Sequence, residues 1–195
     1  MKKILTILSL SILLVSCGGK AEKAGPVQTA LREFILERYP ELDKVTFETI
    51  EETKTVTFDE EILRREKLFA LRMKQDDGLY KKFVQEGKQK NAQLRYDSLL
   101  QDIRIKNGID SIRVKMGDGV NDVAFTVYTF TAKAEGKDKV LNFRENLAAV
   151  TPDYTVVNLA PKSSELYKAT GRVIPGYREL LKGDEASAEE VGLAE

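Results

Sequence analysis

Apolar side chains recur at one spacing in the middle of this chain and at another in its second half, and this change limits the fold more than any other feature. Between about residues 60 and 106 the apolar positions follow a helical repeat among many charged residues. Between residues 112 and 159 apolar and polar residues mostly alternate, as they do along β-strands. Helices grouped in one stretch and strands in another are typical of an α+β protein, which is the fold class we predict.

The first expected helix spans residues 27–39. Pro26 suits the first helical turn, Tyr39-Pro40 ends the pattern, and one apolar stripe lies between them. The stripe is formed by Val27, Ala30, Leu31, Phe34 and Ile35. We expect this helix to pack its stripe against a sheet.

A charged helical hairpin is expected over residues about 60–106. Asp59 suits the capping position, Asp76-Asp77-Gly78 predicts the break between two helices, and Asn107-Gly108 predicts the end of the second. The second helix has a polar middle that cannot be buried on every side. Part of the hairpin should therefore project into solvent or contact a partner.

The strand patterns predict an antiparallel meander of four or five strands. The expected strands are residues 45–58, with a break near Glu51-Glu52, and residues 112–116, 123–134, 140–150 and 154–159. Residues 123–134 are apolar on both faces, which indicates a central strand covered on both sides. A helix across a curved meander resembles the cystatin or nuclear-transport-factor-type arrangement. That resemblance implies a concave pocket between helix and sheet.

The N-terminus has a basic start, Met1-Lys2-Lys3, followed by an apolar run over residues 4–15. The run is too short to cross a bilayer as a single helix and suits a secretory signal. It ends in Leu14-Val15-Ser16-Cys17, which resembles the lipobox of bacterial lipoprotein precursors. The resemblance implies that a signal peptidase recognises Leu14, Val15 and Ser16, cuts before Cys17, and leaves Cys17 lipidated.

This resemblance also implies a division of the chain and a location. Residues 1–16 are the expected signal peptide, 17–25 a tether, 26–182 a single α+β domain, and 183–195 a disordered acidic tail. Gly18 stands where an Asp would favour retention in the inner membrane of enteric bacteria. The expected location is the cell envelope, at the periplasmic face of the outer membrane. In a Gram-positive host the anchor would lie in the single cell membrane.

Composition excludes several classes of function. The chain has no His, and its single cysteine is the expected lipid site, so imidazole and thiol catalysis are both excluded. The 31 basic and 31 acidic residues balance, which gives no electrostatic case for nucleic acid. We expect no cofactor and no enzymatic activity. The acidic pairs Glu51-Glu52 and Glu60-Glu61 are expected to be exposed acids, and Tyr128, Tyr154, Tyr167 and Tyr177 to be core residues.

One stretch, Gly117-Asp118-Gly119-Val120-Asn121-Asp122, resembles the magnesium-binding motif of haloacid dehalogenase-type phosphatases. That family also needs an Asp-x-Asp nucleophile motif, which this chain lacks. Gly and Asn-Asp are the residues that a hairpin turn requires, so we expect a turn here. A divalent-cation site with oxygen ligands at Asp118 and Asp122 is kept as the alternative.

Two functions of different classes follow. The first is a non-catalytic lipoprotein that is held in the membrane by its lipid and binds another envelope protein through the hairpin 60–106. The second is a small-ligand binder or carboxylate-based hydrolase that uses a pocket between helix and sheet.

Overall fold

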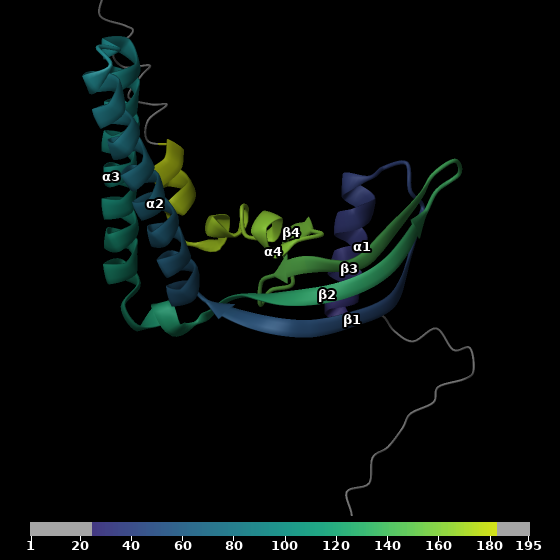
Figure 1. Cartoon of the computed structure of the whole chain (residues 1–195). Coiled ribbons are helices and arrows are strands. Elements are labelled where there is room, and N and C mark those ends of the chain that lie inside the picture. Colours follow the sequence, from purple (N-terminus) through teal and green to yellow (C-terminus); the bar gives the residue numbers. More distant parts are fainter. Residues whose placement is uncertain (1–24, 183–195) are drawn as a thin grey trace, which may run out of the picture.

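The computed structural model describes residues 25–182 and arranges them as a projecting helical arm beside a four-stranded sheet (Figure 1). The expected signal peptide, Cys17, almost all of the tether and the acidic tail lie outside the described residues. The elements in chain order are α1 (Pro26–Arg38), β1 (Lys44–Thr57), α2 (Phe58–Gln85), α3 (Gln89–Met116), the 3₁₀ turn η1 (Gly117–Asn121), β2 (Val123–Glu135), β3 (Val140–Val150), β4 (Val156–Ala160), α4 (Ser163–Leu166) and the 3₁₀ turn η2 (Thr170–Val173). A final helical segment covers 177–182.

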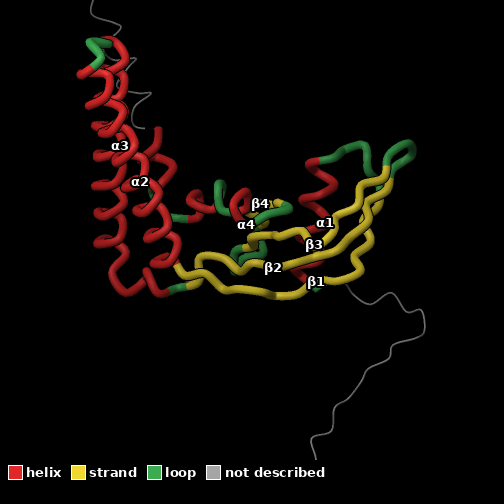
Figure 2. Tube along the Cα trace, viewed as in Figure 1, coloured by secondary structure: helices red, strands yellow, loops and turns green. Residues whose placement is uncertain are grey.

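The sheet is an antiparallel meander in the order β1-β2-β3-β4, so the predicted α+β class is confirmed. Figure 2 shows the four strands as one curved layer that extends away from the base of the arm. β1 is continuous through Glu51-Glu52, where a break was expected; its pairing with β2 instead shifts register at three places. Such bulges let a long strand bend without ending.

Both faces of the sheet are covered, as the two-sided pattern of residues 123–134 predicts. On one face, Leu31 and Ile35 of α1 pack with Phe130. On the other face, Leu166 of α4 packs with Phe125. Successive side chains of a strand point to opposite faces, so the apolar residues of β2 serve both clusters.

β3 departs from the expectation that Leu141, Phe143 and Leu147 share a face. Leu141 and Phe143 pack on the α1 side, whereas Leu147 packs on the α4 side. Between them Glu145 has a φ of 49°, and the β2–β3 pairing shifts register. One extra residue in a strand exchanges the faces of all residues that follow, which explains the difference.

The arm consists of α2 and α3, with 28 residues each and a length of about 42 Å at 1.5 Å per residue. The predicted break at Asp76-Asp77-Gly78 is wrong, because α2 continues to Gln85 and the chain turns at Gly87, whose φ is 67°. A glycine inside a helix costs only about 1 kcal/mol, which the packing of the helix can offset.

The predicted helix end at Asn107-Gly108 and the predicted strand 112–116 are also wrong, because α3 continues to Met116. Ile112 and Met116, four residues apart, pack on one side of the helix, while Val114 is 81% exposed. The alternation that suggested a strand was therefore produced by a helix with a partner on one side. This partner is the segment 174–182, which is too far from α3 in the sequence to be visible in the local pattern.

Residues 174–182 return to the base of the arm and complete its core. Ile174 and Tyr177 pack with Ile62 and Phe69 of α2 and with Ile105 and Ile109 of α3. Beyond this three-part cluster, the described residues of the arm are those of α2, α3 and their connecting turn. The arm rises from one end of the sheet, and α1 lies toward the other (Figure 1).

Candidate functional site

The seam between the two helices of the arm contains acidic side chains. Asp76 and Asp102 are both buried. Arg95 Nη1 donates to Asp76 Oδ1 at 3.1 Å, and Arg72 Nη2 lies 2.9 Å from Asp102 Oδ1. Each arginine reaches its acid from the half-exposed edge of the seam. These ion pairs occupy places that leucines fill in most two-helix seams.

Asp102 is the least satisfied of these groups. Within the described part of the chain, neither of its buried carboxylate oxygens has a hydrogen bond of good geometry. Burial raises the pKa of Asp102 above its ordinary value, and the nearby Asp76 raises it further, while Arg72 opposes both. The seam of the arm therefore contains a buried carboxylate with incomplete hydrogen bonding.

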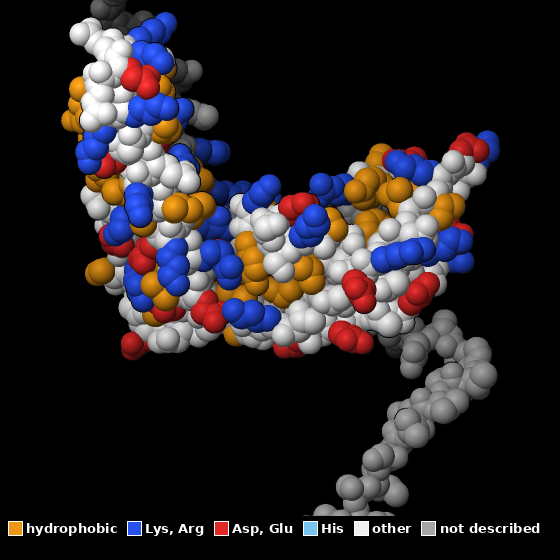
Figure 3. Space-filling view, in the orientation of Figure 1, with side chains coloured by type: hydrophobic (Ala, Val, Ile, Leu, Met, Phe, Trp, Pro, Cys, Tyr) orange, Lys and Arg blue, Asp and Glu red, His pale blue; other side chains and the backbone are white. Residues whose placement is uncertain are grey.

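Leucines, by contrast, lie on the outside of the arm. Leu71 of α2 is 55% exposed and Leu94 of α3 is 58% exposed, and Leu68, Leu100 and Val84 are exposed as well. A shallow groove of about 510 Å³ follows α3, lined by Leu94, Asp97, Ser98, Leu100, Gln101 and Arg104. Figure 3 shows apolar and charged side chains interspersed on the arm, beside a hollow that lies above the sheet.

Helical spacing places Leu94 on the face of α3 that the returning segment covers. Leu94 and Gly108 are 14 residues apart, or two heptads, and Gly108 contacts Leu180 of the returning segment. The face that residues 174–182 cover at the base therefore continues toward the tip without cover from the described residues.

A buried polar network joins the base of the arm to the segment after the sheet. Arg65 Nη2 donates to Glu61 Oε1 at 2.5 Å, to the Tyr167 carbonyl at 2.6 Å and to Thr170 Oγ1 at 3.0 Å. Thr170 Oγ1 in turn donates to Glu61 Oε1 at 2.9 Å. Gly171 is required here, because a Cβ on it would lie 2.6 Å from Arg65 Nε. The network is an internal clamp with its groups satisfied.

The two acidic pairs that were considered as acid–base groups form structural or surface interactions instead. Glu61 is fully buried in this clamp, so the expectation that it is exposed is wrong, whereas Glu60 is exposed and forms a 3.4 Å ion pair with Lys54. Glu51 and Glu52 are exposed on β1, where Glu52 accepts a hydrogen bond from Thr55. Their interactions are those of structural and surface acids.

The four tyrosines do not line one pocket. Tyr128 packs in the cluster under α1, Tyr167 in the cluster under α4, and Tyr177 in the base of the arm. Tyr154 was expected in the core as well, but this is wrong, because it is exposed at the β3–β4 turn. Burial raises the pKa of both Tyr128 and Tyr177, so both phenols are protonated at neutral pH.

Asp118 and Asp122 lie in and just after η1, the connection from α3 to β2. This is a turn, as expected, but it joins a helix to a strand and is not a hairpin turn. Both side chains are exposed. Across residues 25–182 no group of three or more His, Cys, Asp or Glu side chains converges to hold a metal ion. The arrangement gives the cation alternative no support.

The space between α1 and the sheet is packed with side chains. Leu31, Ile35 and Phe130 are fully buried there. A surface groove of about 380 Å³ lies beside this core, lined by Ala30, Glu33, Phe34, Glu37, Tyr154, Thr155 and Val156. The concave pocket that the cystatin-like resemblance implies is not formed in this core.

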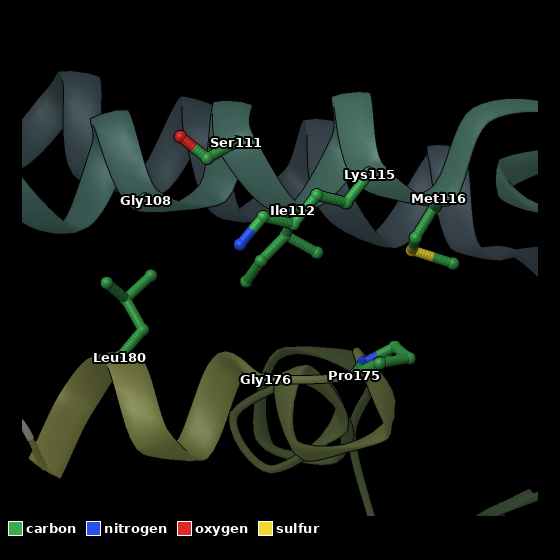
Figure 4. A pocket seen from close by; sticks show the side chains of 8 residues that line it. All are labelled: Gly108, Ser111, Ile112, Lys115, Met116, Pro175, Gly176 and Leu180. Carbon is green, nitrogen blue, oxygen red and sulfur yellow. The ribbon is translucent and has the colours of Figure 1, made fainter.

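An apolar pocket of about 550 Å³ lies instead between α3 and residues 174–182, as Figure 4 shows. Its walls are Gly108, Ser111, Ile112, Lys115, Met116, Pro175, Gly176 and Leu180. Sequence reasoning missed this pocket because it assigned Ile112–Met116 to a strand. The four-residue spacing of Gly108, Ile112 and Met116 was the signal that could have revealed one helical face.

Comparisons with known proteins identify no relative of this chain. No family model matches the chain, and no curated protein or solved structure is significantly similar to it. The cystatin or nuclear-transport-factor-type resemblance is thus not confirmed. Among residues 25–182, no helix combines the length and the apolar character that crossing a bilayer requires.

Proposed function

We propose that this chain is a non-catalytic lipoprotein of the cell envelope that binds another envelope protein through its helical arm. The lipid on Cys17 anchors the chain, at the periplasmic face of the outer membrane. The proposal combines the lipobox resemblance of residues 14–17 with the shape and surface of the arm.

The observation that carries the binding role is the inverted polarity of the arm. Asp76 and Asp102 lie in its seam, while Leu71 and Leu94 face solvent. Isolated two-helix arms gain little from exposed leucines, and a contiguous exposed apolar surface commonly marks an interaction site. A partner helix that covers this face would bury the leucines and form a three- or four-helix bundle.

Charge substitution of exposed leucines tests the role of the arm. We expect Leu71→Glu combined with Leu94→Glu to abolish in-cell crosslinking from a photoreactive residue placed at Leu68. The matched control is Ala70→Glu combined with Val114→Glu, which adds the same charge at two other exposed positions of α2 and α3. Equal crosslinking in both double variants, or none in the wild type, would contradict the proposal.

The anchor is tested separately. Cells supplied with labelled palmitate should label the wild-type protein and leave Cys17→Ala unlabelled. The variant should also remain unprocessed, because signal cleavage in this class follows lipidation. An unlabelled wild-type protein would refute the anchor without bearing on the arm.

A further inference from the structure

The pocket between α3 and residues 174–182 has the composition of a site for an apolar ligand. Ile112, Met116 and Leu180 provide its walls, and each of these side chains is only half-buried in the structure. Its volume of about 550 Å³ lies within the range of about 300–1,000 Å³ that is usual for small-molecule sites. The flexible side chain of Met116 can adapt to the shape of a ligand chain.

One cation lies at this pocket. Lys115 is the only charged residue among the lining residues, and within residues 25–182 it makes no ion pair or side-chain hydrogen bond. Figure 4 shows its side chain extending along α3, with the ammonium group in the gap between the helix and residues 174–182. The hydroxyl of Ser111 donates to the Asn107 carbonyl at 2.9 Å, so it is occupied within the helix.

From this geometry we infer that the pocket binds an acyl chain that ends in an anionic group. The chain lies against Ile112, Met116 and Leu180, and Lys115 pairs with the anion. An apolar wall with a single unpaired cation favours an amphiphile over a polar metabolite, which would leave hydrogen-bonding groups unsatisfied. The inference does not depend on the partner of the arm, and its test does not involve the arm's outer face.

The test uses residues 17–195 with Cys17→Ser, a span that contains the whole fold described above. Hexanoate, octanoate and decanoate are titrated as monomers, with Ile and Met methyl signals followed by NMR. We expect affinity to rise about fourfold per methylene, the ratio that corresponds to about 0.8 kcal/mol per buried CH₂. The largest shifts should be those of Ile112 and Met116.

Two further comparisons define the role of the charge. Lys115→Met should weaken decanoate binding by up to about fivefold, as for a half-exposed ion pair, and leave 1-decanol binding unchanged. Lys74→Met, which removes an exposed lysine of α2, should change neither. Equal decanoate affinity in Lys115→Met and the wild type would overturn the assigned role of Lys115.

Vesicles distinguish the source of the acyl chain. Shifts at Ile112 and Met116 with decanoate indicate a free fatty acid, and the same shifts only with phosphatidylglycerol vesicles indicate the acyl chain of a lipid. Either result supports the pocket. If neither probe shifts these methyl groups, or if decanoate shifts only methyl groups elsewhere, the inference is wrong.

Discussion

At the scale of single residues, we expect the largest effects on stability from the clamp, the buried network of Glu61, Arg65 and Thr170 at the base of the arm. Replacing Arg65 with Met removes the buried cation beside the fully buried Glu61 carboxylate, which then keeps only Arg64 Nε, at 3.0 Å, and the hydroxyl of Thr170. We expect a loss of about 1.5–3 kcal/mol in the free energy of unfolding, measured by urea denaturation, because the variant loses hydrogen bonds to a buried charged group. Thr170→Val, which removes one hydroxyl from the same network, should cost about 1–3 kcal/mol.

The control for this prediction removes both charges. Glu61→Leu with Arg65→Met should recover much of the loss, since buried ion pairs can be exchanged for apolar groups at little net cost. A double variant as unstable as Arg65→Met alone would show that the clamp acts through shape and not through charge.

The raised pKa of Asp102 predicts that the stability of the fold depends on pH. Its pKa is raised in the folded protein, mainly by burial, so the folded state binds a proton more readily than the unfolded state. Its ionisation therefore removes stability as pH rises from the ordinary Asp range through the folded pKa. We expect Asp102→Asn to raise the melting temperature relative to wild type more at pH 7 than at pH 4, by calorimetry. An equal difference at both pH values would contradict this.

At the scale of elements, two glycines of the arm should respond in opposite ways. Gly78 lies inside α2 with nothing within 4 Å of an added Cβ, so Gly78→Ala should stabilise the protein by about 1 kcal/mol. Gly87 forms the turn with a φ of 67°, so Gly87→Ala should cost about 1–2 kcal/mol. Thermal unfolding monitored by circular dichroism measures both. A destabilising Gly78→Ala would indicate that α2 is broken there.

At the scale of the whole molecule, the core consists of separate clusters. Ile35 belongs to the cluster under α1 and Ile109 to the cluster at the base of the arm, and the two clusters share no buried residue. We expect Ile35→Val and Ile109→Val to cost about 0.5–1.5 kcal/mol each, and the double variant to cost their sum within about 0.5 kcal/mol. Clear non-additivity in urea denaturation would show that the sheet and the arm are coupled.

What the sequence by itself determined about this protein was local. The apolar stripe of residues 27–39, the apolar character of residues 123–134 on both faces and the turn after residue 116 each depend on near neighbours, so the α+β class and the meander were predictable. The lipobox resemblance of residues 14–17 is also a local signal, and its consequences remain predictions.

Only the tertiary structure decided the extent of α3, the face of Leu147 and the pocket beside Lys115. Residues 174–182 stabilise a helix where the local pattern favours a strand, and one extra residue in β3 reverses a face. Both effects depend on contacts between residues far apart in the chain. The free energy of burying Gly108 and Ile112 against Leu180 exceeds the local preference, and no window of sequence includes all three.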